Sequence, residues 1–118
     1  MTNKYLKYAE RLHSIGDLIV EISNLIQIGS IESVRATEEK FDYAIASVKD
    51  VKPPEEVNKE HNELVNALRM WNLGNKQANG MKSEHIVINA QAAMLKYQSV
   101  IEGITDRIVQ KLKPLVQN

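Results

Sequence analysis

The chain has 118 residues, of which 43% are hydrophobic and 25% are charged, and this is the composition of one globular domain spanning residues 1–118. Fifteen Lys and Arg balance fifteen Asp and Glu, so no net field favours nucleic acid or an anionic membrane as a partner. The absence of cysteine excludes disulfides, thiolate metal sites, cysteine nucleophiles and lipid attachment through a cysteine.

A first helix is predicted from Asn3 to Ile28. Its apolar residues recur at alternating spacings of three and four, which places them on one side of a helix: Tyr5, Tyr8, Leu12, Ile15, Ile19, Ile22 and Ile26. Asn3 is a suitable N-cap residue, and Gly29 suits the left-handed position that ends a helix. Ser30 can then cap the next helix after a short, tight turn.

The same period predicts a second helix over Ile31–Asp50 and a third over Pro54–Ala78. Pro53 and Pro54 stop the second helix, because the residue before a proline avoids the helical region and proline suits the first position of a new helix. Asn and Gly residues weaken the third helix after Trp71, so its end is expected between Leu73 and Asn79.

A fourth helix is predicted from Ser83 to Lys113 and is expected to end at Pro114. Gly103, in its interior, is expected to allow a close helix crossing. No segment alternates with period two, and no apolar run approaches the ~20 residues that a membrane span needs. The sequence therefore predicts an all-α fold: an antiparallel up-down-up-down four-helix bundle with helices at about 3–28, 31–50, 54–78 and 83–113.

Two polar residues are expected in the core of this bundle. His61 falls on the apolar face of the third helix, and its ring is expected to bond to a backbone carbonyl near the Pro53–Pro54 turn. Glu38 lies close to the seam of the second helix and can pair with His61 if the two helices align. A ligand contact or a pH switch at His61 is the alternative interpretation.

The sequence predicts no catalytic residue, no cofactor and no metal site. Glu10 and His13 form one Glu-x-x-His motif, but a di-iron bundle needs a second such motif and two further Glu residues. No nucleophile stands at a recognisable spacing from a base, and the chain has no glycine-rich phosphate loop.

Two sets of residues are candidates for binding a protein partner. Met70, Trp71 and Leu73 form one, because tryptophan often anchors interfaces, although Trp71 is also in register with the core positions of its helix. Gln91 and Gln98, followed by Thr105, recur every seven residues beside the apolar stripe of the fourth helix. They are interpreted either as a polar strip for a ligand or a second subunit, or as the edge of the buried face.

The segment from Val51 to Val57, with its Pro-Pro pair, is followed by His61, Leu64, Val65 and Leu68. This pattern resembles the helical hairpin of bundle domains in small Gram-positive secreted proteins and lipoproteins of unknown function. The resemblance covers about 20 residues and implies a helix-turn-helix and a bacterial or phage origin.

The leading functional hypothesis is a small, non-enzymatic bacterial or phage protein that acts by protein–protein interaction, as an inhibitor, immunity protein or adaptor. One alternative is a homo-oligomeric structural protein, for example a homodimer. Another is an envelope-associated structural or sensor domain. A cytoplasmic location is expected, because the first residues lack the apolar core of a signal peptide. An exported protein whose leader has been removed is the alternative.

Overall fold

Helices account for almost all of the computed structural model, which describes residues 3–116. Within this range there are six α-helices, one short 3₁₀-helix and no strand. The helices are α1 (Lys4–Ile28), α2 (Ile31–Arg35), α3 (Thr37–Asp50), η1 (Glu55–Val57), α4 (Asn58–Asn79), α5 (Glu84–Ala93) and α6 (Lys96–Val116). The all-helical prediction is therefore confirmed.

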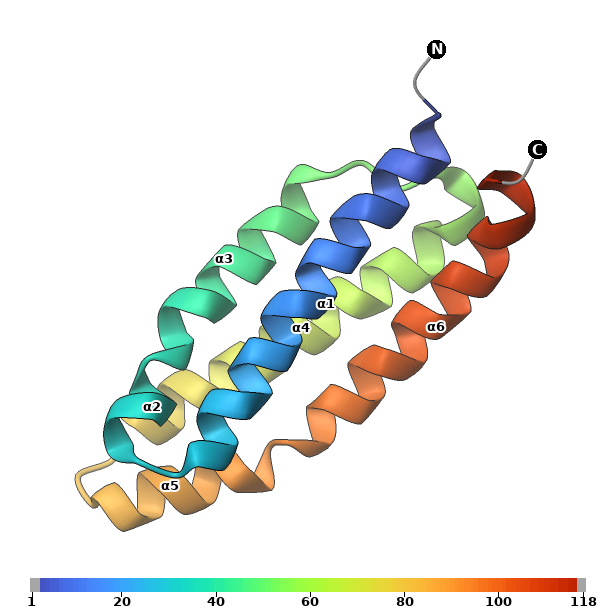
Figure 1. Ribbon diagram of the computed structural model, residues 1–118. Helices are drawn as coiled ribbons and strands as arrows, with labels where there is room; N and C mark the ends of the chain where they lie inside the picture. Colours follow the sequence, from blue (N-terminus) through green and yellow to red (C-terminus); the bar gives the residue numbers. More distant parts are fainter. Residues whose placement is uncertain (1–2, 117–118) are drawn as a thin grey trace.

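Four long helices, α1, α3, α4 and α6, lie side by side along an elongated molecule of 53 × 21 × 19 Å (Figure 1). The short helices α2 and α5 lie together at one end, and α1 begins near the opposite end, where α6 finishes. The apolar stripes of the long helices meet along the axis. The fully buried side chains at their centre include Ile15, Ile22, Phe41, Leu64, Leu68, Trp71, Ile101 and Ile108.

The residues predicted to begin and end the first helix, and to begin the second, have the expected backbone conformations and hydrogen bonds. The side chain of Asn3 accepts a hydrogen bond from the Tyr5 amide at 2.9 Å and so caps α1. Gly29 adopts a φ of 76°, a conformation that glycine takes without steric cost. Ser30 then caps α2 by accepting from the Ser33 amide at 3.1 Å.

The predicted second helix is interrupted at Ala36, which separates α2 from α3. The hydroxyl of Thr37, the next residue, donates to the carbonyl of Val34 at 2.6 Å. Such a bond from a threonine back to the preceding turn competes with the helical ladder and bends a helix. The prediction of one continuous second helix was wrong at this point.

The predicted fourth helix is also interrupted, between α5 and α6. The amides of Met94 and Leu95 donate to the carbonyls of Gln91 and Ala92, three residues back, at 3.1 and 3.2 Å. These bonds form a tighter turn of 3₁₀ type. The side chain of Met94 lies directly over Gly74 of α4, where a β-carbon would collide with its sulfur. The absence of a β-carbon on Gly74 thus leaves room for the Met94 side chain.

Three further details differ from the sequence-based prediction. Gly103 faces open space, so it does not mediate the close crossing that was expected there. The third helix begins with the 3₁₀ turn η1 after Pro54, and α4 itself starts at Asn58. Helix α6 continues through Pro114, because the proline removes only a bond to the carbonyl of Gln110, an exposed residue whose carbonyl water can satisfy.

Candidate functional site

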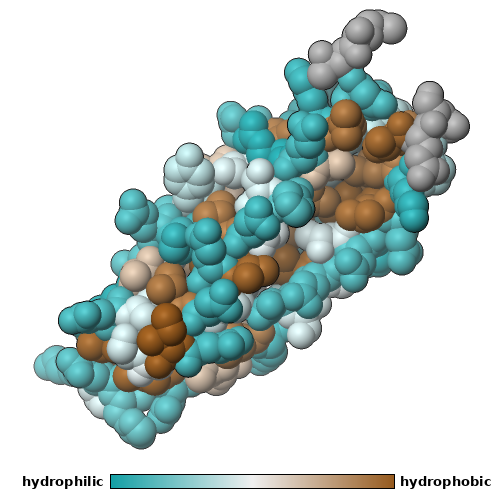
Figure 2. All heavy atoms as spheres, viewed as in Figure 1, coloured by the Kyte–Doolittle hydropathy of each residue, from teal (hydrophilic) through white to brown (hydrophobic). Residues whose placement is uncertain are grey.

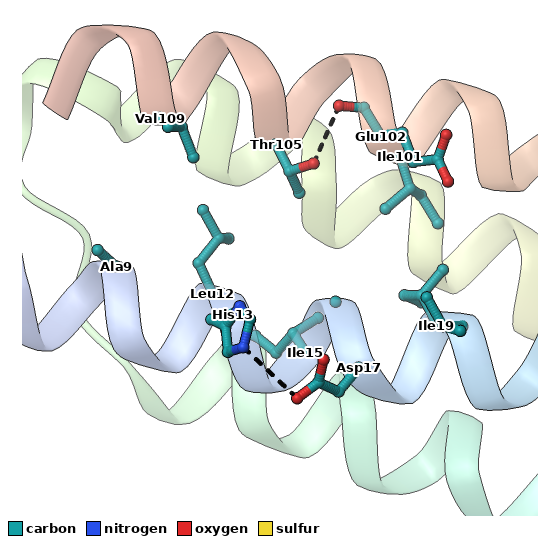
Figure 3. Close-up of a pocket in the computed structure, with 12 residues that line it drawn as sticks. Ala9, Leu12, His13, Ile15, Asp17, Ile19, Ile101, Glu102, Thr105 and Val109 are labelled. Atoms are coloured by element: carbon teal, nitrogen blue, oxygen red, sulfur yellow. Dashed lines mark hydrogen bonds and ion pairs between the residues drawn. The ribbon is translucent and has the colours of Figure 1, made fainter. Parts of the chain in front are cut away.

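An open groove runs along the surface between α1 and α6. Its volume is about 430 Å³. The α1 residues that line it are Ala9, Leu12, His13, Ile15, Gly16, Asp17, Ile19 and Val20, and the α6 residues are Ile101, Glu102, Thr105 and Val109. Figure 3 shows the two rows facing each other, with Val109 over Ala9 and Leu12 at one end and Ile101 over Ile19 at the other.

The floor of the groove is apolar. Leu12, Ile15 and Ile101 are core residues whose side chains form part of this floor. Val20 and Val109 also line it and are each about half exposed. Figure 2 shows hydrophobic side chains gathered in the strip between the two helices, with hydrophilic side chains on either side of it.

The seam between α1 and α6 differs from the three other seams between neighbouring long helices. Each of those is crossed by at least one ion pair: Arg11–Asp50 and Lys40–Glu21 join α1 to α3, Lys76–Asp42 joins α3 to α4, and Glu63–Arg107 and Glu60–Lys111 join α4 to α6. Among the described residues, no hydrogen bond or ion pair joins α1 to α6. The larger of the two pockets, the apolar groove, thus lies at the seam that no described polar contact crosses.

The polar groups at the groove are carboxylates, one imidazole and one hydroxyl. Asp17 and Glu102 are acidic, and neither Lys nor Arg is among the described lining residues. Nε2 of His13 lies 3.7 Å from a carboxylate oxygen of Asp17, and both side chains are more than two-thirds exposed. The hydroxyl of Thr105 donates to the backbone carbonyl of Glu102 at 2.9 Å. The groove thus presents an apolar surface edged by negative charge.

The predicted Met70–Trp71–Leu73 set divides between the core and the surface. Trp71 is fully buried, edge-on to Phe41 with ring centroids 5.0 Å apart and stacked on Tyr97 at 6.3 Å. Met70 and Leu73 are each more than half exposed, on the outside of α4. They do not line the α1–α6 groove.

The predicted glutamine strip is also divided, because the turn at Met94 changes the phase of the helix. Gln91 is completely buried, and Gln98 is half-buried and donates to Glu102 at 2.9 Å. Only Thr105, the third member of the repeat, lines the groove. The three residues therefore do not form one continuous surface.

Gln91 belongs to a buried polar layer near the end of the molecule that carries α2 and α5. Its amide nitrogen donates to the side-chain oxygen of Asn75 and, at 3.2 Å, to that of Asn79. The hydroxyl of Thr37 lies 3.1 Å from the same Asn75 oxygen. Glu38, expected near His61, is instead half-buried and accepts from Asn79 at 3.1 Å. This layer joins α3, α4 and α5.

His61 is buried, as predicted, and its partner is Tyr8 of α1. The Tyr8 hydroxyl lies 2.6 Å from Nδ1 of His61. Burial lowers the pKa of His61 below its ordinary value of 6.5, and the Val48 backbone opposes part of this change. Burial also raises the pKa of the Tyr8 hydroxyl. The neutral ring, accepting from Tyr8, is the form that fits this site.

A second, more open pocket of about 340 Å³ lies at the seam between α1 and α3, lined by Arg11, Tyr43, Ala46, Ser47 and Asp50. Within residues 3–116, no three His, Asp or Glu side chains are arranged to hold a metal ion, and no helix is long and apolar enough to cross a bilayer. Comparison with protein-family models, curated proteins and solved structures gave no match. The α1–α6 groove is the larger of the two pockets and is lined mainly by apolar residues.

The sequence analysis did not identify the groove, although the chain carries signals of it. Val20 and Val109 are large apolar residues that lie off the main stripes of their helices. Ala9 and Gly16 are small residues at the edge of the α1 stripe, and nothing lies within 4 Å of a β-carbon placed on Gly16. Recognising these signals as one site required knowing that α1 and α6 are neighbours.

Proposed function

We propose that this chain is an antiparallel up-down-up-down four-helix bundle that acts by binding another protein through the α1–α6 groove, without catalysis. The alternating order is supported by Figure 1, in which consecutive long helices run back and forth along the molecule. An inhibitor, immunity protein or adaptor of bacterial or phage origin fits this role, and the resemblance around Pro53 and Pro54 supports that origin.

One observation carries the proposal: an apolar groove remains open at the one seam that no described polar contact crosses. Exposed apolar surface edged by polar groups is characteristic of sites where proteins bind their partners. Filling the groove would remove Val20 and Val109 from water, at a gain of roughly 25 cal/mol for each Å² of apolar surface buried. Covering this seam with another apolar surface would therefore stabilise the complex.

The polar groups of the groove support a binding role over catalysis. His13 and Asp17 lie at the rim with most of their surface in water, where a charge pair is weak and a general base is poorly activated. The Thr105 hydroxyl proton is directed to the Glu102 carbonyl and not to a base. These groups can instead fix the orientation of a partner.

The test is to fill the groove without disturbing the fold. Gly16→Leu places a side chain in open space inside the groove, and leucine forms helices better than glycine. Gly103→Leu is the matched control, because Gly103 is also helical and open but does not line the groove. Affinity capture from the organism that encodes the chain should retain a partner with the wild type and with Gly103→Leu, and lose it with Gly16→Leu. If all three proteins retain the same partners, the groove is not the binding site and the proposal fails.

A further inference from the structure

The shape of the groove is that of a seat for one more helix. Its α1 wall runs from Ala9 to Val20, about three helical turns or roughly 17 Å. Both walls are helices, so their side chains form ridges and grooves that another helix can pack against. An entering helix with apolar residues at every third or fourth position would place one residue per turn over Leu12, Ile15 and Ile101.

The charges of the groove select among such helices. Asp17 and Glu102 stand on opposite walls, as Figure 3 shows, and they are not balanced by any Lys or Arg among the described lining residues. A helix with acidic flanks would bring like charges together as water is excluded, whereas Lys or Arg on its flanks would pair with the two walls. Because the whole chain has no net charge, this local preference is not a general attraction for basic molecules.

We propose that the groove binds an amphipathic α-helix of a partner protein, with its apolar face on Leu12, Ile15 and Ile101 and with basic side chains beside Asp17 and Glu102. This inference rests on the proposed function and specifies the class of partner. The bound helix packs as a fifth long helix and covers the seam between α1 and α6.

Two synthetic peptides of about 18 residues, each long enough to form a helix, test the proposal. They share one Leu and Ala face, and their flanking positions are Lys in the first and Glu in the second. Binding is followed by fluorescence anisotropy of a dye on each peptide. The proteins are the wild type, Gly16→Leu, Gly103→Leu and the double variant Asp17→Lys with Glu102→Lys, each checked for helical content by circular dichroism.

The Lys peptide should bind the wild type and Gly103→Leu equally and the Glu peptide much more weakly. Gly16→Leu should weaken the Lys peptide about tenfold or more, the loss expected when one well-packed apolar contact is blocked. The double charge reversal should exchange the preference, so that the Glu peptide now binds more tightly. Raising the salt concentration should reduce the difference between the two peptides.

Three results would overturn the inference. If neither peptide binds, or if Gly16→Leu binds as well as the wild type, helix docking in the groove is wrong. If both peptides bind equally before and after charge reversal, a basic partner is wrong. If light scattering shows a wild-type dimer that Gly16→Leu converts to monomer, the occupant is a second copy of the chain. In each case the capture experiment still decides the proposed function separately, because it depends on the groove and not on the charge or helicity of the partner.

Discussion

At the scale of single residues, the contact between Tyr8 and His61 is a polar interaction between two buried side chains. It joins the first helix to α4 across the centre of the bundle, and His61 retains only 5% of its exposure. The Tyr8 hydroxyl donates to Nδ1 when the ring is neutral, so a proton on that nitrogen would remove its acceptor. The folded protein therefore disfavours the charged form of His61.

This preference predicts a pH dependence of stability. The pKa of His61 is lower in the folded protein than its ordinary value of 6.5, so the unfolded chain binds more protons between the two values. The free energy of unfolding should be fully present above pH 6.5 and fall as the pH drops toward the lowered pKa, by at most about 1.4 kcal/mol per pH unit for one proton. Urea denaturation of the wild type at pH 7.5 and 5.5 measures this loss.

The comparison variant is His61→Gln, which keeps an acceptor for Tyr8 but cannot titrate in this range. Other titrating groups are common to both proteins, so their contributions cancel. The variant should lose less stability than the wild type over the same pH interval. An equal loss in both proteins would show that His61 is not the group responsible.

At the scale of secondary structure, local chemistry was predictable from the sequence and the helix interruptions were not. Asn3, Gly29 and Ser30 act through their own backbone neighbours, so their residue types are sufficient to place the ends of helices. At the turn near Met94, the sulfur of that residue packs against Gly74 twenty residues away, a tertiary contact that the sequence pattern does not reveal. Hydrophobic period alone also could not show that α1 and α6 leave an open seam, because it identifies apolar faces and not their neighbours.

Two of the three helical glycines, Gly103 and Gly74, predict different mutational effects. Gly103→Ala should raise the free energy of unfolding by about 1 kcal/mol, because alanine favours the helix and its β-carbon meets open space. Gly74→Ala should raise it by less despite the same gain in helix propensity, because the new β-carbon requires the Met94 sulfur to move aside. Urea denaturation of each variant measures both changes.

The cause of the Gly74 effect can be isolated with a second substitution. Met94→Ala removes the sulfur that must move, so Gly74→Ala should stabilise the protein more in that background than in the wild type. A double-mutant cycle in which the two changes are strictly additive would contradict the proposed contact.

At the scale of the whole molecule, the end of the bundle that carries α5 has fewer buried residues than the central helix α4. Helix α4 buries seven residues, including Leu64, Leu68 and Trp71, whereas α5 buries only Val87 and Gln91 among its ten. The segment that leads into α5, from Met81 to Ile86, is exposed throughout. Few buried apolar contacts mean a low free energy for local opening.

Hydrogen exchange followed by mass spectrometry should reveal this difference. Amides of α5 should exchange faster than those of α4, whose opening requires disruption of the central core. The α6 amides between Ile101 and Ile108 serve as an internal reference, since they follow α5 in the chain but pack on the core. Equal protection of α5 and α4 would mean that the buried polar layer holds this end as firmly as the apolar core does.

The chain has a single tryptophan, Trp71, enclosed between Phe41 and Tyr97 and outside the set of residues that line the groove. Fluorescence excited at the long-wavelength edge of indole absorption therefore comes from this one buried residue. Its emission should be blue-shifted while the bundle is intact and shift to longer wavelength as the helices separate. Binding of a partner in the groove should leave that emission maximum unchanged, so one unlabelled sample can distinguish binding from unfolding of the bundle.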